Sequence, residues 1–274
     1  MKNKLKISIA WQKIIISKIK KIKPMIEYFG EFLGTMILIL LGNGVVANVN
    51  LNKTHSFGGG WIVITFGWSM AVYVAVLVSG DMSGAHLNPA VTLGLAFSGL
   101  FSWLKVAPFI VFQILGAMAG ASLVYVFFKS HFNITETPGT KKACFCTAPA
   151  IRNFKLNFFS EVMGTFVLIL AVLLITLPQL EYESLAGHKV GMGSLGALPV
   201  ALVVFSIGLS LGGTTGYAIN PARDLGPRIV HAMLPLKSKD NNDWPYAWIP
   251  VIGPVLGAAI AAAVYLFINF VCKN

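Results

Sequence analysis

Six apolar stretches, each long enough to cross a lipid bilayer, limit what this sequence can fold into. They cover roughly residues 25–49, 60–80, 105–128, 157–180, 195–212 and 246–271, and a membrane-spanning helix needs roughly 20 residues. Backbone groups cannot stay unpaired in lipid, and these stretches lack the alternating pattern of a membrane β-barrel. Only 11% of the residues are charged, against about 25% in soluble domains. We therefore predict an all-α membrane protein with six transmembrane helices.

The net charge of +11 is concentrated ahead of the first apolar stretch. Basic residues flanking a span favour the cytoplasmic side, so we expect a cytoplasmic N-terminus, and six spans return the C-terminus to the same side. The connection at 129–156 is also basic and would lie outside, which argues against this orientation. We give the charges before the first span more weight. The segment Trp11 to Lys23 fits either an amphipathic helix on anionic lipid or a solvated tail. The lysines that precede the first span are Lys2, Lys4, Lys6, Lys13, Lys18, Lys20, Lys21 and Lys23.

The chain contains two similar halves. Gly30–Thr35 (GEFLGT) resembles Ser160–Thr165 (SEVMGT), and Ser83–Ala90 (SGAHLNPA) resembles Thr215–Ala222 (TGYAINPA). Three spans per half insert the second copy upside down relative to the first, which gives an inverted repeat. We therefore divide the chain into a basic cytoplasmic tail (1–24), a first three-helix repeat (25–128), a connecting loop (129–156), a second, inverted repeat (157–271) and a C-terminal tail (272–274).

Each half contains one Asn-Pro-Ala tripeptide, at Asn88, Pro89 and Ala90 and at Asn220, Pro221 and Ala222. Asn is a preferred N-cap and Pro is favoured at the first helical position. The apolar stretches that follow, Val91–Leu100 and Leu225–Leu234, are long enough for about half of the bilayer core. We therefore predict two re-entrant half-helices.

Inverted symmetry brings the two half-helix N-termini together at the middle of the membrane. Each presents roughly half a positive charge there, which repels cations. We expect the side-chain amides of Asn88 and Asn220 to be free to donate to the oxygen of a passing solute.

The two halves, both Asn-Pro-Ala boxes and the segment Asn220–Pro227 (NPARDLGP) resemble the major intrinsic protein family of aquaporins and aquaglyceroporins over about residues 26–271. The resemblance implies a right-handed six-helix bundle with two half-helices and a homotetramer with one pore per subunit. It also implies a passive channel in the plasma membrane that passes small uncharged solutes and excludes ions and protons. Neither an enzymatic activity, nor a cofactor, nor a metal, nor a nucleic-acid partner is expected.

By resemblance, the narrow selectivity filter of the family falls at Trp68, Gly208, Tyr217 and Arg223. Water-selective members carry His at the position matched by Gly208, so glycine there implies a wider opening. Trp68 and Tyr217 offer an aromatic corner to a carbon chain, while Arg223 donates to hydroxyls. These features imply the glycerol-passing subgroup, with glycerol, water, small polyols or urea as solutes. Tyr217 stands where Phe is commoner, which leaves the ratio of water to glycerol flux open.

Four further residues are expected to support the pore. Glu31 and Glu161 occupy matched positions in predicted spans and would brace the half-helix loops, with an ion relay as the alternative. His86 is expected to be a scaffold histidine, with gating by protonation as the alternative. Asp224, directly after the arginine, resembles the glycerol-passing subgroup.

Other readings remain open at this point. A water-selective or mixed-solute channel for urea or metalloids would share the same architecture. An ion-coupled secondary transporter would need a coupling-ion site beyond Glu31 and Glu161. Asn52 and Asn133 each fit the glycosylation sequon, and whether either is used is left open. The three cysteines, Cys144, Cys146 and Cys272, are expected to be free thiols.

Overall fold

The computed structural model describes residues 2–176 and 191–273, and its regular elements over these ranges are all helical. Within them, six helical segments are long and apolar enough to cross a membrane. This confirms the predicted all-α fold with six spans, and the chain is an integral, multi-pass membrane protein. The spans are built from α1 (Lys2–Asn50), α2 (Gly60–Ser83), α4 (Trp103–Phe127), α7 (Phe154–Leu174), the 3-10 helix η1 (Gly193–Ala197) with α8 (Leu198–Ser210), and α10 (Trp244–Ala247) with α11 (Ile249–Lys273).

The fourth span is shorter than the sequence indicated. We expected it to reach residue 180, but α7 ends at Leu174 and Ile175 already has extended backbone dihedrals. A proline stands at position 178, and a proline disfavours a helix that runs through it. The end of the predicted span, from residue 177, lies outside the described residues.

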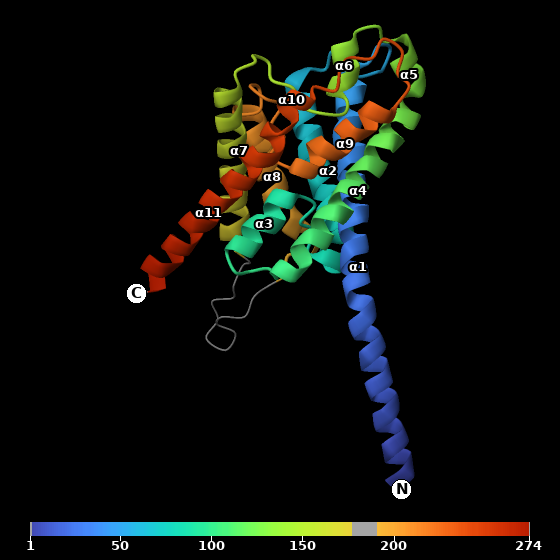
Figure 1. Cartoon of the computed structure of the whole chain (residues 1–274), viewed down its shortest axis with the longest axis vertical. Coiled ribbons are helices and arrows are strands. Elements are labelled where there is room, and N and C mark those ends of the chain that lie inside the picture. Colours follow the sequence, from blue (N-terminus) through green and yellow to red (C-terminus); the bar gives the residue numbers. More distant parts are fainter. Residues whose placement is uncertain (1, 177–190, 274) are drawn as a thin grey trace.

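Two shorter helices, α3 (Pro89–Phe97) and α9 (Pro221–Met233), lie among the long ones (Figure 1). Both begin at the proline of an Asn-Pro-Ala box, as predicted. The predicted ends were too late, at Leu100 and Leu234. Gly99 has a left-handed φ of +72°, which stops α3. Leu234 is extended and precedes a proline, which stops α9.

The long helices of the two halves pack in matching ways: α4 lies against α1, and α11 lies against α7. Glycines permit both close approaches. A Cβ added at Gly116 would lie 2.3 Å from the carbonyl oxygen of Phe32, and one at Gly257 would lie 2.4 Å from that of Val162. Gly116 with Gly120 and Gly253 with Gly257 have the small-xxx-small spacing that lets two helices pack closely.

The connecting loop contains two short helices, α5 (Lys129–Ile134) and α6 (Pro138–Ala143), at the end of the bundle opposite the N-terminus (Figure 1). The loop is tied to residues before α10 by an ion pair between Lys142 and Asp240, 2.5 Å apart, and by another between Arg152 and Asp243. The contact with Lys142 lowers the pKa of the Asp240 carboxyl. Cys144, Cys146 and Cys272 are free, as expected.

At the opposite end, α1 continues through Pro24 as one helix and extends beyond the bundle (Figure 1). The boundary expected between a tail and the first span therefore falls inside a continuous helix. A salt bridge between Glu27 and Lys105, 2.7 Å apart, ties α1 to the first turn of α4.

Candidate functional site

The asparagines of the two boxes cap the half-helices with their side-chain oxygens. Asn88 Oδ1 accepts from the backbone N–H of Ala90 at 2.8 Å. Asn220 Oδ1 accepts from those of Ala222 at 3.0 Å and Arg223 at 3.2 Å. An N-cap oxygen of this kind satisfies amide groups that have no partner within the helix. Both half-helices therefore begin where the sequence indicated.

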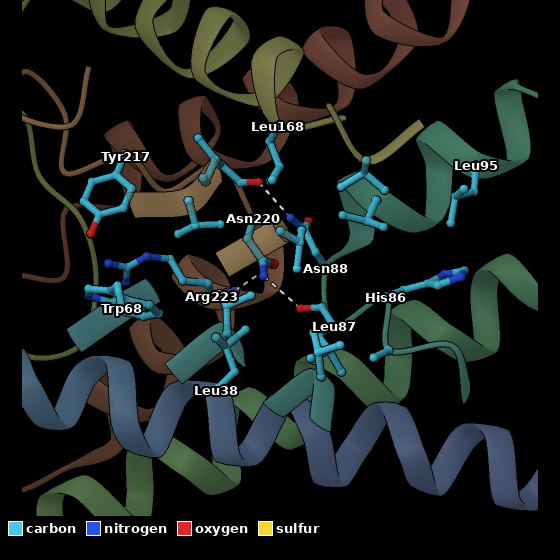
Figure 2. Close-up of a pocket in the computed structure, with 18 of the residues that line it drawn as sticks. Leu38, Trp68, His86, Leu87, Asn88, Leu95, Leu168, Tyr217, Asn220 and Arg223 are labelled. Carbon is cyan, nitrogen blue, oxygen red and sulfur yellow. Dashed lines mark hydrogen bonds between the residues drawn. The ribbon is translucent and has the colours of Figure 1, made fainter. Parts of the chain in front are cut away.

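The amide nitrogens of the same asparagines join the two halves. Asn88 Nδ2 donates to the carbonyl oxygen of Ile219 at 2.9 Å, and Asn220 Nδ2 donates to that of Leu87 at 2.8 Å (Figure 2). The expectation that both amides are free was therefore wrong in part. A side-chain amide has two N–H groups, so one is used in this exchange and the other remains for a solute.

The loops that lead into the half-helices have an unusual backbone. In each of them the residues four, three and one before the asparagine have positive φ. Left-handed backbone at a non-glycine residue costs of order 1–3 kcal/mol and persists only where the surroundings impose it. Both loops therefore need support from outside themselves. The residues are Gly84, Ala85 and Leu87 in the first loop and Gly216, Tyr217 and Ile219 in the second.

Glu31 supplies that support for the first loop. Its carboxylate accepts from the backbone N–H groups of His86 at 3.0 Å and Leu87 at 2.8 Å. It also accepts from Ser83 Oγ at 2.6 Å and Gln113 Nε2 at 2.7 Å. The side chain is fully buried, and it lies on α1, as the matched repeats indicated.

Glu161 of α7 supports the second loop in the same way. It accepts from the backbone N–H groups of Ala218 at 3.0 Å and Ile219 at 2.8 Å, and from Thr215 Oγ1 at 2.7 Å. Thr215 and Ser83 are each five residues before the asparagine of their box. Both glutamates thus have the contacts expected of loop braces.

A cavity of about 290 Å³ runs past both boxes (Figure 2). Asn88 and Asn220 lie at its middle, and Trp68, Tyr217 and Arg223 lie toward one end. His86 lies on the other side of the asparagines (Figure 2). Most of the remaining lining is aliphatic, from residues Leu38, Val72, Val76, Val91, Leu95, Leu168, Val172, Ile175, Val200 and Val204.

His86 is held inside the scaffold as well as lining the cavity. Its Nδ1 is 3.1 Å from Thr92 Oγ1. Its ring centroid lies 4.6 Å from that of Phe101 and 5.0 Å from that of Phe109. These contacts favour the scaffold role over gating.

Arg223 presents its donors to the cavity. Its guanidinium carbon lies 4.0 Å from the centroid of the Trp68 ring, which permits a cation–π interaction. Its side chain has no hydrogen-bond acceptor within the described part of the chain, and it is only 8% exposed. Trp68 itself packs on Gly42, where an added Cβ would lie 2.3 Å from the Trp68 ring.

Gly208 has a different place from the one expected. It does not line the cavity, because the ring of Tyr217 covers it. A Cβ added at Gly208 would lie 3.0 Å from Tyr217 Cζ and 2.9 Å from Thr65 Cγ2. The glycine therefore makes room for the tyrosine ring instead of leaving an opening. A glycine at this position suggested an empty space in the pore. The sequence alone did not show that the Tyr217 ring occupies this space.

Asp224 also lies outside the cavity lining, in a buried network beside Arg223. It accepts from Arg228 Nε at 2.7 Å, and from the Thr147 backbone N–H at 2.8 Å and hydroxyl at 2.6 Å. Arg228 also donates to the carbonyl oxygens of Thr147, Asn242 and Asp243. The network ties the first turn of α9 to two loops.

The sequence analysis missed Gln113 and Thr147, which contact Glu31 and Asp224. Their positions lie outside both repeated motifs, so no spacing identified them. Among the described residues, no group of three or more His, Cys, Asp or Glu side chains could hold a metal ion.

Comparison with known proteins agrees with this geometry. The family model described as "Major intrinsic protein" matches residues 18–265. The chain is 55% identical to the glycerol uptake facilitator protein of Streptococcus pneumoniae over 241 residues, covering 88% of this chain and 98% of that protein. It is 51% identical to the probable glycerol uptake facilitator of Thermotoga maritima, with the same coverage.

A solved structure shares the fold. The X-ray structure of the aquaglyceroporin from Plasmodium falciparum superposes with a TM-score of 0.75 at 33% identity, covering 88% of this chain and 95% of that one. The family match, the two capped half-helices and the cavity between them lead to one conclusion: the chain belongs to the major intrinsic protein family of membrane channels.

Proposed function

We propose that this chain is a passive channel for glycerol and that water, small polyols and urea share its path. The observation that carries the proposal is the chemistry of the cavity at Trp68, Tyr217 and Arg223. Aromatic rings form one part of its wall, and the Arg223 guanidinium, which has no hydrogen-bond acceptor among residues 2–176 and 191–273, forms another. Relatives named as glycerol uptake facilitators support the same solute.

A polyol suits this wall because its carbon chain presents C–H groups on one side and hydroxyls on the other. The rings of Trp68 and Tyr217 would contact the C–H groups. Arg223 and the remaining amide N–H groups of Asn88 and Asn220 would donate to hydroxyl oxygens. A site with a mostly apolar lining and a few placed polar groups orients a small ligand in this way.

Exclusion of ions and protons follows from the same groups. The N-termini of α3 and α9 meet at the middle of the cavity, and each contributes a partial positive charge. Arg223 adds a full positive charge at the narrow end. A cation would lose water of hydration without gaining a negative partner there.

We further propose a homotetramer, embedded in lipid of the plasma membrane, with one pore per subunit and cytoplasmic N- and C-termini. The lysines ahead of the first span support this orientation. Large apolar side chains such as Phe66, Val126 and Phe267, which are exposed in the single chain, are available to contact lipid or neighbouring subunits.

Stopped-flow measurements on proteoliposomes test the proposal. Imposed glycerol and water gradients should dissipate much faster than in empty vesicles, without saturation and without dependence on a proton or sodium gradient. A pH-sensitive dye in the same vesicles should report no added proton flux. Saturable uptake driven by an ion gradient would instead identify a secondary transporter, and water flux without glycerol flux would identify a water-selective channel.

A further inference from the structure

Trp61, in the first turn of α2, contacts the wall of the pore from outside it. The residue does not line the cavity and is 39% exposed. Its indole Nε1 donates to the carbonyl oxygen of Gly208 at 2.9 Å. Its ring centroid lies 5.8 Å from that of Tyr217, with the ring planes at 78°. Trp61 therefore touches Tyr217, which lines the cavity together with Arg223, and Gly208, which makes room for the Tyr217 ring.

The hydrogen bond to Gly208 completes the end of α8. The last four carbonyl groups of a helix lack partners within it, and α8 ends at Ser210. The carbonyl of Ile207 accepts from the backbone N–H of Leu211 at 2.8 Å, and that of Gly208 accepts from Trp61. An indole N–H is only a donor, so this bond fixes the indole against the end of α8.

The ring of Tyr217 has no polar anchor of its own. Its hydroxyl is buried and has no hydrogen-bond partner among residues 2–176 and 191–273. The ring is instead held by packing: a Cβ added at Gly208 would lie 3.0 Å from Tyr217 Cζ, and one at Gly212 would lie 2.5 Å from its Cδ1. Trp61 closes the same pocket, because a Cβ added at Gly212 would also lie 3.0 Å from Trp61 Cζ2.

We propose that Trp61 is a positioning residue that fixes the Tyr217 ring and thereby limits the width of the solute that passes Arg223. The inference rests on the proposed glycerol path and names what sets its upper size limit. Without the indole, the Tyr217 ring gains space on one side, and neither its hydroxyl nor a backbone contact restores its position. Larger polyols should gain more from this freedom than glycerol, and water should gain least.

Two variants separate the contributions of the indole. Trp61→Phe removes the donor to Gly208 and keeps an aromatic ring beside Tyr217, whereas Trp61→Ala removes both. Trp248→Ala is the matched control, since Trp248 is similarly exposed at 46%, contacts Phe158 and does not line the cavity. Each protein is reconstituted at equal density, and permeabilities to water, glycerol and the four-carbon polyol erythritol are measured.

We expect the ratio of erythritol to glycerol permeability to rise about fivefold in Trp61→Ala, a part of the roughly 10- to 200-fold discrimination that one added carbon can give in a rigid pocket. Trp61→Phe should raise the ratio less, and Trp248→Ala should leave it unchanged. In a Tyr217→Ala background, Trp61→Phe and Trp61→Ala should have no further effect on the ratio, because the coupling runs through that ring.

Three results would overturn the inference. In the first, all three permeabilities fall by one common factor, which indicates a purely structural role. In the second, the ratio shifts equally in the Tyr217→Ala background. In the third, Trp61→Ala does not fold and the ratio of erythritol to glycerol permeability in Trp61→Phe equals that of the wild type. Failure of the wild-type protein to pass glycerol would instead contradict the proposed function itself.

Discussion

The two re-entrant loops of this channel share a backbone and differ in the side chains that they place around the pore. Both have positive φ at the same three positions, and both are held by a buried glutamate through two backbone N–H groups. These shared contacts position the half-helices and would serve any solute. They explain why the repeat is visible in the sequence.

Two of the differences that bear on the cavity lie three residues before and three residues after the asparagine. The first loop has Ala85 and Val91 there, and the second has Tyr217 and Arg223. At these two positions the second loop contributes a ring and a guanidinium, and the first contributes only aliphatic side chains; the ring that the first loop adds to the cavity is His86, two residues before its asparagine. From this loop the second half supplies a ring and a guanidinium to the cavity, and they lie near Trp68 of the first half. The comparison teaches that the glutamate brace is common to both copies, whereas the proposed filter joins Tyr217 and Arg223 of one copy to Trp68 of the other.

The largest expected effect comes from changing the braces, and it should differ between the halves. Among the described residues, Glu161 Oε2 has the Ile219 N–H as its one hydrogen-bond partner. Glu161→Gln therefore places an amide N–H₂ against that N–H, with no second partner that can turn to accept from it, and we expect a cost of about 3 kcal/mol. Glu31→Gln should cost less, about 1–2 kcal/mol. Gln113 Oε1 is buried and has no partner among the described residues, so the Gln113 amide can rotate by half a turn and accept from the new amide N–H₂.

Thermal unfolding in detergent measures this difference. Gln113→Leu combined with Glu31→Gln is the control, since it removes the compensating acceptor and should bring the cost up to that of Glu161→Gln. Equal destabilisation by the two single substitutions would show that the braces are equivalent despite Gln113.

The next largest effect concerns the support of Tyr217. Water-selective members of the family carry His at the position matched by Gly208, and from this alone Gly208→His would be expected to block glycerol and keep water. Because the tyrosine ring already occupies this space, we expect the histidine to obstruct both solutes, with glycerol flux lowered by about a hundredfold for a clash of a few kcal/mol. Paired stopped-flow measurements of the two fluxes check this.

Removing the tyrosine ring should restore the water path alone. Gly208→His combined with Tyr217→Ala makes room for the imidazole in place of the phenol, so water should pass while glycerol stays blocked. Glycerol flux that survives within about twofold in Gly208→His would contradict the assignment of this position to the filter, since even 1.4 kcal/mol is about tenfold in rate.

A smaller effect is expected when the second loop is given the residue of the first. Arg223→Val copies Val91 and removes the full positive charge from the narrow end of the cavity, so proton or cation leak should rise about tenfold or more, for a barrier lowered by at least 1.4 kcal/mol. Water flux should persist. The dye-based proton assay measures this, with Val91→Ala as the control. Unchanged exclusion would assign the barrier to the half-helix N-termini.

The sequence predicted the backbone of this site better than its side-chain packing. The spans, the half-helix starts and the positions of Glu31 and Glu161 follow from hydropathy, capping preference and repetition, which are local or periodic signals. The use of the asparagine amides between halves and the contact of Trp61 with Gly208 join residues more than a hundred positions apart. The covering of Gly208 by Tyr217 depends on how the irregular loop after α8 folds back. No spacing rule reports such contacts, so they became visible only in three dimensions.

The smallest expected effect is that of Thr147→Val, which removes a partner of Asp224. Asp224 stands four residues after its asparagine, where the first half has Thr92. Thr92 Oγ1 contacts His86 Nδ1, Gln113 Nε2 and the carbonyl oxygen of Asn88 at 2.9–3.1 Å. Thr147→Val removes one hydroxyl donor from Asp224, which keeps the Thr147 backbone N–H and Arg228 as donors. We therefore expect Thr147→Val to cost about 0.5–1 kcal/mol. Thr92→Val should cost about 2 kcal/mol because it removes the partner of His86 Nδ1, while Gln113 Nε2 keeps Glu31 and the Asn88 carbonyl keeps the Thr92 backbone N–H. Thermal unfolding of both variants, with Thr147→Ser as a control that keeps the hydroxyl, measures the difference. A Thr147→Val cost equal to that of Thr92→Val would mean that the remaining donors to Asp224, the Thr147 backbone N–H and Arg228, do not compensate for the lost hydroxyl. The contacts of Asp224 would then be as sensitive to the loss of one hydroxyl as the contacts of Thr92.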